Sequence, residues 1–246
     1  MYILFSPSEG KKFIGEELSL NKSSLLFPSL YKKRLHILKK YNEIISTAST
    51  EILQKLTGIK KEEEIKKYQL NLFKSPSIEA INRYDGVAYD YLDINSLSDS
   101  EKEFLYKQTL IFSNLFGPLL GGDKVPVYKL KQGSSIDNIK TEQVYKKEFS
   151  KSLDSMFKDE LILDLRAGFY EKFYSLKQPF ITMKFLKGGK SVSHWAKAYR
   201  GKVLRTISQV QPSNEKELLD IKFDGLKLIE TTTYKKFGKM LVYEVI

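Results

Sequence analysis

Short apolar segments of strand length alternate irregularly with amphipathic segments of helix length, and this pattern constrains the fold most. Residues Tyr2–Phe5 and Leu161–Leu165 are apolar runs typical of buried strands. Residues 141–156 and 196–210 instead carry apolar side chains at helical spacing. No repeat and no long linker divides the chain, so the pattern predicts one α+β domain over residues 1–246. We expect a single mixed α/β domain with a central, largely mixed sheet and surrounding helices.

Local start and stop signals predict the remaining elements. Ser98 is followed three residues later by Glu101, which is the pattern of a capping box at the start of a helix over 98–108. In the expected helix at 28–41, Arg34 is placed on the outer face with the neighbouring lysines. The other predicted helices span 43–56, 61–68 and 213–219, and the other predicted strands span 110–112, 179–185, 192–194, 226–230 and 240–245, with 125–130 extended.

The composition excludes several classes of site. The chain has no cysteine, which rules out disulfides, thiolate catalysis and cysteine-ligated metals. We expect no metal site and no cofactor. The chain has only two histidines, His36 and His194, and the alternative, an iron site of two His and one carboxylate, requires these two to meet. The first five residues are apolar, which is too short for a signal peptide, and no apolar run is long enough to span a membrane. We therefore expect a cytoplasmic protein without a membrane partner.

The chain is strongly basic, with a formal net charge of +11 and a pI of about 9.4. Such a balance is typical of proteins that bind DNA, RNA or a phosphorylated ligand. A general bias toward lysine explains it equally well, because only five of the 41 basic residues are Arg. Arg binds phosphate better than Lys, so the five positions 34, 83, 166, 200 and 205 are the informative ones.

A basic segment over about 43–68 resembles a helix-hairpin-helix element. Gly58 lies between two predicted helices, and Lys60 and Lys61 follow it. Such a turn can present backbone N–H groups to a DNA phosphate next to a helix N-terminus. An ordinary glycine cap between two helices gives the same pattern, and the surrounding lysines keep the two interpretations even.

Polar and glycine-containing turns follow several predicted strands, which is where ligand sites commonly form. Lys11 ends the turn after the first strand, and Arg166 follows the buried 161–165 strand. Asp164 needs a partner if it is buried, and a structural pair with Arg166 is the alternative to a site. Between Ser113 and Gly133, several glycines surround Asp123 and Tyr128, and an irregular loop is the simpler interpretation there.

The segment 193–201 carries the only Trp and two of the five Arg when it is continued to Arg205. On a helix, Lys197 and Arg200 lie three residues apart and can converge on one anion. A solvated basic stripe with Trp195 in the core is the structural alternative.

Taken in order along the chain, these segments resemble the YaaA family of bacterial peroxide-stress resistance proteins. The resemblance rests on SPSEGK at 6–11, RYDGVAY at 83–89, the loop at 113–133, LDLRAGFY at 163–170 and SHWAKAYRG at 193–201. Two departures occur within the loop: Leu120-Gly121 stand where the family usually has Arg-Pro, and Val127-Tyr128-Lys129 replace Pro-Tyr-Arg. The positions that match the motifs best are Lys11, Asp123, Tyr128, Arg166, Tyr170, Lys197, Arg200 and Arg205.

The resemblance implies a mixed α/β fold with a positively charged cleft and DNA binding through a helix-hairpin-helix element. It also implies protection against hydrogen peroxide and help in limiting free intracellular iron. The DNA contact, which we expect not to be sequence-specific, is predicted at Gly58, Lys60, Lys61, Lys197, Arg200 and Arg205.

The alternative function is an enzyme that acts on a small phosphorylated or nucleotide-like ligand in a basic cleft. Its candidate catalytic residues are Lys11, Asp123, Tyr128, Arg166, Lys197 and Arg200.

Overall fold

A computed structural model describes residues 1–15, 20–191 and 193–246. Its main feature is an eight-stranded sheet with the order β11-β12-β9-β8-β1-β5-β6, in which β10 pairs with β9. The five inner strands, from β12 to β5, are parallel, whereas β11, β6 and β10 pair antiparallel with their neighbours. This arrangement confirms the predicted mixed sheet and explains why β1, β5 and β8 at its centre are buried along nearly their whole length.

The strands of the main sheet range from two to nine residues in length. The strands of this sheet are β1 (Tyr2–Phe5), β5 (Thr109–Ser113), β6 (Gly117–Leu120), β8 (Ile162–Asp164), β9 (Phe180–Lys187), β10 (Lys190–Ser191), β11 (Leu226–Tyr234) and β12 (Gly238–Val245). Two small ladders pair β2 (Gly10–Lys11) with β4 (Tyr84–Asp85) and β3 (Ser77–Glu79) with β7 (Lys124–Pro126).

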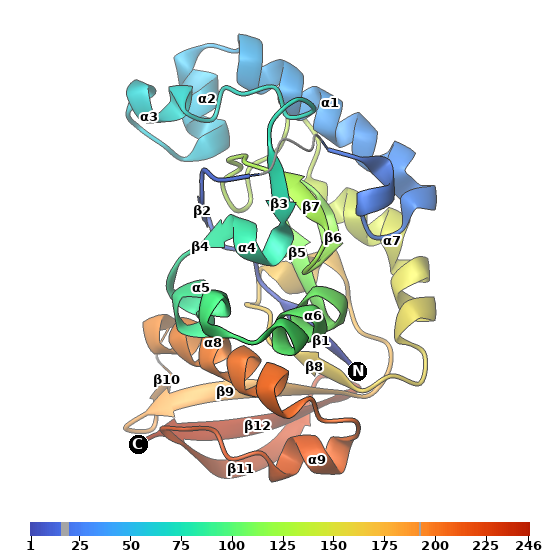
Figure 1. Ribbon diagram of the computed structural model, residues 1–246, viewed down its shortest axis with the longest axis vertical. Helices are drawn as coiled ribbons and strands as arrows, with labels where there is room; N and C mark the ends of the chain where they lie inside the picture. Colours follow the sequence, from blue (N-terminus) through green and yellow to red (C-terminus); the bar gives the residue numbers. More distant parts are fainter. Residues whose placement is uncertain (16–19, 192) are drawn as a thin grey trace.

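Helices surround the sheet in two groups. Helices α1, α2 and α3 form a lobe at one end of the molecule, and α8 lies against β9 near the other end, beside α5 and α6 (Figure 1). The helices are α1 (Tyr31–Thr47), α2 (Thr50–Thr57), α3 (Glu62–Lys66), α4 (Ala80–Arg83), α5 (Val87–Leu92), α6 (Asp99–Gln108), α7 (Thr141–Phe157), α8 (Ser193–Val210) and α9 (Glu215–Asp220). Short 3-10 turns occur at Lys22–Ser24, Pro28–Leu30, Ile94–Ser96 and Tyr170–Phe173.

Several sequence predictions are confirmed in detail. The capping box forms at α6, where Ser98 and Glu101 exchange side-chain and backbone hydrogen bonds. Gly58 ends α2 in the left-handed conformation, with φ of 74°. The buried face of α8 contains Tyr199, Val203 and Ile207, as the helical spacing predicted.

Two predictions about the first helix are wrong. The helical break expected near residue 42 occurs instead at Ala48 and Ser49, because Tyr41 and Ile45 both pack in the core and keep α1 continuous. Arg34 is not on the outer face but is fully buried. Its guanidinium donates to the carbonyl oxygens of Phe116 and Pro118, at 2.9 and 2.5 Å, and to that of Leu26.

Other differences arise where the sequence lacks a clear period. The strand expected at 192–194 is replaced by the first residues of α8, while residue 192 lies outside the described residues. Strand β6 and helix α5 form where no regular element was predicted. Across the described part of the chain, no helix combines the length and apolar character that a membrane crossing requires.

Candidate functional site

A cavity of about 400 Å³ opens beside the carboxyl ends of β1 and β8. Phe5 and Leu165, at or just beyond those strand ends, form part of its apolar wall. In parallel sheets this is the edge where ligands usually bind. The loop 6–10 and the segment 85–89 form two further sides, and α8 contributes Lys197 and Arg200.

The loop 6–10 is held in place by hydrogen bonds to the segments around it. The Oγ atom of Ser6 accepts a hydrogen bond from the backbone N–H of Ala167, at 2.8 Å. The backbone oxygen of Ser6 accepts from the Tyr89 hydroxyl, at 2.9 Å. Ser8 Oγ donates to the backbone oxygen of Asp85, at 2.5 Å. These three hydrogen bonds fix this wall of the cavity to the rest of the fold.

Lys11 supports the same loop from below and does not line the cavity. Its Nζ donates to the backbone oxygens of Ser8 and Glu9, at 2.9 and 3.2 Å. The ammonium also lies 4.5 Å from the ring centroid of Tyr128 and 5.3 Å from that of Tyr84. Burial, reinforced by the charge of Lys129, lowers the pKa of Lys11 to about 7.

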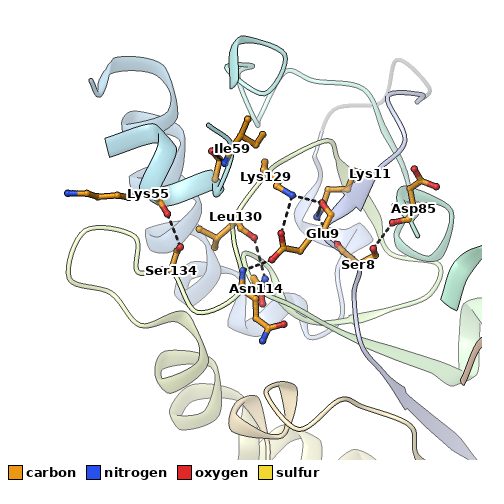
Figure 2. Close-up of polar contacts among 12 residues, drawn as sticks. Ser8, Glu9, Lys11, Lys55, Ile59, Asp85, Asn114, Lys129, Leu130 and Ser134 are labelled. Atoms are coloured by element: carbon orange, nitrogen blue, oxygen red, sulfur yellow. Dashed lines mark hydrogen bonds and ion pairs between the residues drawn. The ribbon is translucent and has the colours of Figure 1, made fainter. Parts of the chain in front are cut away.

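Glu9 joins this loop to the segment 129–132, as Figure 2 shows. Its Oε2 atom lies 3.3 Å from Lys129 Nζ, and its Oε1 atom accepts from the backbone N–H of Gln132 at 3.1 Å. Burial raises the pKa of Glu9, but the Gln132 hydrogen bond and the Lys129 charge together bring it below its ordinary value. Lys129, which stands where the family usually has Arg, thus helps to hold the loop 6–10 in place through Glu9.

Tyr128 lies beneath the cavity rather than in its wall. Its hydroxyl is 2.7 Å from Ser113 Oγ and 2.8 Å from the hydroxyl of Tyr84, and all three groups are buried. The ring of Tyr128 supports the Lys11 ammonium. The structure therefore brings Lys11 and Tyr128 together, as one layer under the loop.

Lys197 and Arg200 form the cationic side of the cavity. Lys197 is exposed, and Arg200 is half-buried, so that desolvation lowers the pKa of Arg200 despite the nearby carboxylates of Asp164 and Glu171. Within the described residues, the buried Nε of Arg200 has no hydrogen-bond partner. The next residue, Gly201, lies so close to the backbone oxygen of Ala88 that no Cβ would fit, which explains the close packing of α8 on α5.

Two predicted candidates lie outside the cavity and have structural partners. Asp123 accepts hydrogen bonds from the backbone N–H groups of Leu26 and Leu120, at 2.7 and 3.1 Å, and burial raises its pKa to about 6. Arg166 forms a bidentate pair with Asp164, at 2.9 and 2.7 Å, and also donates to backbone carbonyls. The buried Asp164 thus has the partner that its position requires.

Arg205 also has backbone partners. Its Nη1 donates to the carbonyl oxygens of Leu92 and Asp93, at 2.9 and 3.0 Å, where α5 ends. It lies 3.8 Å from the Asp93 carboxylate. Arg205 therefore fixes the end of α5 against α8, although part of its side chain is exposed.

The turn at Gly58 lies in the α1–α3 lobe and does not line the cavity (Figure 1). The N–H of Gly58 donates to the backbone oxygen of Gln54, and that of Ile59 to Thr57 Oγ1. The Lys60 carbonyl accepts from the Gln54 side chain, at 2.7 Å. Two of the N–H groups of the turn are thus already used within it.

Sequence reasoning missed some of the walls and a surface beside the cavity. Gly86, Ala88 and Gln132 line the cavity; they lie inside the segments 83–89 and 113–133, but they are uncharged and were not selected as site residues. On the same helix as Lys197, Trp195 is 40% exposed and lies 4.7 Å from Lys187 Nζ, so it is not a core residue. Only its being the single Trp could have drawn attention to it.

Within residues 1–15, 20–191 and 193–246, no group of three or more His, Cys, Asp or Glu side chains is placed to hold a metal ion.

Comparison with known proteins extends over nearly the whole chain. An uncharacterized protein of Campylobacter jejuni is 47% identical over 230 residues, which cover 94% of each chain. A UPF0246 protein of Fusobacterium nucleatum is 30% identical over 234 residues, which cover 93% of each chain. A UPF0246 protein of Corynebacterium glutamicum is 30% identical, covering 98% of this chain and 100% of its own. The family model described as "Peroxide stress protein YaaA" matches residues 1–232, and the chain therefore belongs to the YaaA family of peroxide stress proteins.

Proposed function

We propose that this protein acts in peroxide stress by binding DNA without sequence specificity, and that the surface around α8 makes the main contact. The observation that carries the proposal is the pair Lys197 and Arg200, which lie together on one side of the cavity. Within the described residues, neither side chain has an ion pair with a carboxylate at salt-bridge distance, so both are available to phosphate oxygens.

Two exposed aromatic rings on α8 and the neighbouring α5, each with a lysine close to it, support contact with a single strand. Trp195 is 40% exposed, with Lys187 over its ring, and Tyr91 is 41% exposed, with Lys202 Nζ 5.8 Å from its ring centroid. Proteins that bind single strands combine cations that follow the backbone with rings on which bases stack. A solvated lysine surface would not need these rings.

The second proposed contact is the turn at Gly58, with Lys60 and Lys61. It has a weaker electrostatic basis, because α3 begins with three Glu residues at 62–64. Carboxylates in the first turn of a helix stabilise the helix but repel a phosphate at the same place. We therefore expect this turn to add less to the affinity than α8 does.

Fluorescence anisotropy with labelled single-stranded and duplex oligonucleotides, between about 50 and about 200 mM salt, tests the proposal. A strand that contacts both cations should show a steep loss of affinity, and each phosphate contact contributes about 0.7 to the slope of log K against log salt. We expect Lys197→Ala and Arg200→Gln each to lower that slope. Lys39→Ala, which removes an exposed lysine of α1, should leave it unchanged. Equal slopes for all variants would refute the assignment to α8.

A small phosphorylated ligand is the second candidate function, and the volume of the cavity together with its two cations favours it. Lys11 and Tyr128 would then act from beneath by holding the loop 6–10 in place.

Help in limiting free iron stays a prediction. Its test compares the free iron of peroxide-treated cells that lack the gene with that of cells expressing the wild type or Lys197→Ala; equal values in all three would refute it.

A further inference from the structure

We propose that the cavity holds a single nucleotide, with its phosphate at Lys197 and Arg200 and its sugar and base along the apolar wall. This inference rests on the proposed function, because it names the part of a DNA strand that would enter this site. It also applies to a free nucleotide, which has the same chemistry.

Arg200, which lines the cationic side of the cavity, has one side-chain donor without an acceptor among the described residues. The Nε of Arg200 is buried and has no hydrogen-bond partner among the described residues. A buried donor without a partner is costly, and in a native structure it commonly marks a place that a ligand or water fills. Lys197 lines the same cavity three residues earlier on α8, so one phosphate group can contact both side chains.

Much of the remaining lining is apolar and partly built from small side chains, although Glu9 and Asp85 also belong to it. Phe5, Pro7 and Tyr170 contribute larger surfaces, while Ala88 and Ala167 leave room between them. A phosphate alone needs no such wall, whereas the flat base of a nucleotide, together with its sugar, would remove it from water. The combination of a cationic side and an apolar wall therefore favours a nucleotide over inorganic phosphate.

The size of the cavity limits the ligand to one unit. A volume of about 400 Å³ lies near the lower end of the range of small-molecule pockets, which runs from about 300 to about 1,000 Å³. A duplex cannot enter such a space. A nucleotide that enters the cavity must therefore belong to a single-stranded region or to a strand end. A nucleotide inside an intact duplex would first have to leave its stack, which costs a few kcal/mol.

The cavity is also preformed, which lowers the cost of binding. The loop 6–10 is tied to Ala167, Asp85 and Gln132 by hydrogen bonds, and Lys11 holds it from below. The segment SPSEGK thus forms a rigid wall that shapes the site, and its side chains are not proposed to react with the ligand.

Isothermal titration with deoxynucleoside 5′-monophosphates, inorganic phosphate and unphosphorylated nucleosides tests the inference. We expect the monophosphates to bind at least about tenfold more tightly than either fragment, which corresponds to about 1.4 kcal/mol. Val87→Trp places a large ring on the wall of the cavity and should abolish this binding. The matched control is Val210→Trp, at a position of α8 that is 53% exposed and outside the cavity, and it should bind as the wild type does. Ala167→Leu is a milder second block if Val87→Trp does not fold.

Four outcomes separate this inference from the proposed function. Monophosphates that bind no better than phosphate, or that bind the folded blocked variants normally, overturn the inference. Salt-dependent strand binding that persists in that case leaves the proposed function intact. Monophosphate binding without any strand binding supports the cavity ligand and refutes DNA as its source. Competition between monophosphate and single strand supports a nucleotide of the strand as the occupant.

Discussion

Lys11→Met should remove a specific pH dependence of stability. In the folded protein, burial lowers the pKa of Lys11 from 10.5 to about 7. Between these values the unfolded chain binds more protons than the folded one, so the free energy of unfolding rises with pH. Protonated Lys11 costs the fold on the order of 4 kcal/mol near pH 7, and about 2 kcal/mol of this is relieved by about pH 9.

Other groups do not produce the same rise in this range. Burial raises the pKa of Tyr84 to about 12, and such a group lowers stability only above the ordinary tyrosine value of about 10. Asp123, whose pKa is raised to about 6, completes its change below this range. Among these three groups, Lys11 is therefore the one whose contribution changes most between about pH 7 and about pH 9.

Urea unfolding at several pH values in this interval measures the effect. The wild type should gain about 2 kcal/mol, whereas Lys11→Met should be nearly flat. Lys39→Met, which changes an exposed lysine, should follow the wild-type curve. A flat wild-type curve, or a Lys11→Met curve that rises in parallel with it, would refute the description of Lys11 as a desolvated ammonium under the loop.

Three further predictions concern the framework of the site. Arg83 is fully buried and donates to four backbone carbonyls. Arg83→Met should therefore lower the free energy of unfolding, measured in urea, by about 3 kcal/mol, clearly more than Arg205→Met does at a partly exposed position. Equal losses in the two variants would contradict this account. Gly201→Ala forces a Cβ into the backbone of α5 and should lower the melting temperature by several degrees, whereas Gly168→Ala, with its nearest atom 4.0 Å away, should not. Because burial raises the pKa of Asp123, its contribution to the free energy of unfolding is present at low pH and is lost as the pH rises toward about 6. The wild type should therefore lose about 2 kcal/mol of stability between about pH 4 and about pH 7, and Asp123→Asn should remove this fall. An unchanged pH profile of stability in Asp123→Asn would show that Asp123 is not desolvated.

The sequence was informative where local signals act alone. The apolar runs that became β1 and β8, the capping box of α6 and the inner face of α8 all follow from nearest-neighbour chemistry. The pairing of Lys197 with Arg200 was predictable for the same reason, because helical spacing determines which side chains share a face.

Long-range partners were not predictable. Arg34 has the helical position of a surface residue, but carbonyls about 80 residues away, such as that of Phe116, draw it into the core. Arg166 and Asp123 look like site residues in sequence, yet their hydrogen bonds are used by the fold itself. A strand-end position shows where a charge lies along the chain but not whether a distant backbone group already satisfies it.

The most direct test of the central claim is the salt dependence of single-strand binding by the wild type and the Lys197→Ala/Arg200→Gln double variant. If both cations contact phosphates, the slope of log K against log salt should fall by about 1.4, since each single-strand contact contributes about 0.7. A double variant in which Lys60 and Lys61 are replaced with Ala should change the slope less. A slope that is unchanged in the first variant, or that falls mainly in the second, would contradict the assignment of DNA binding to the cavity and α8.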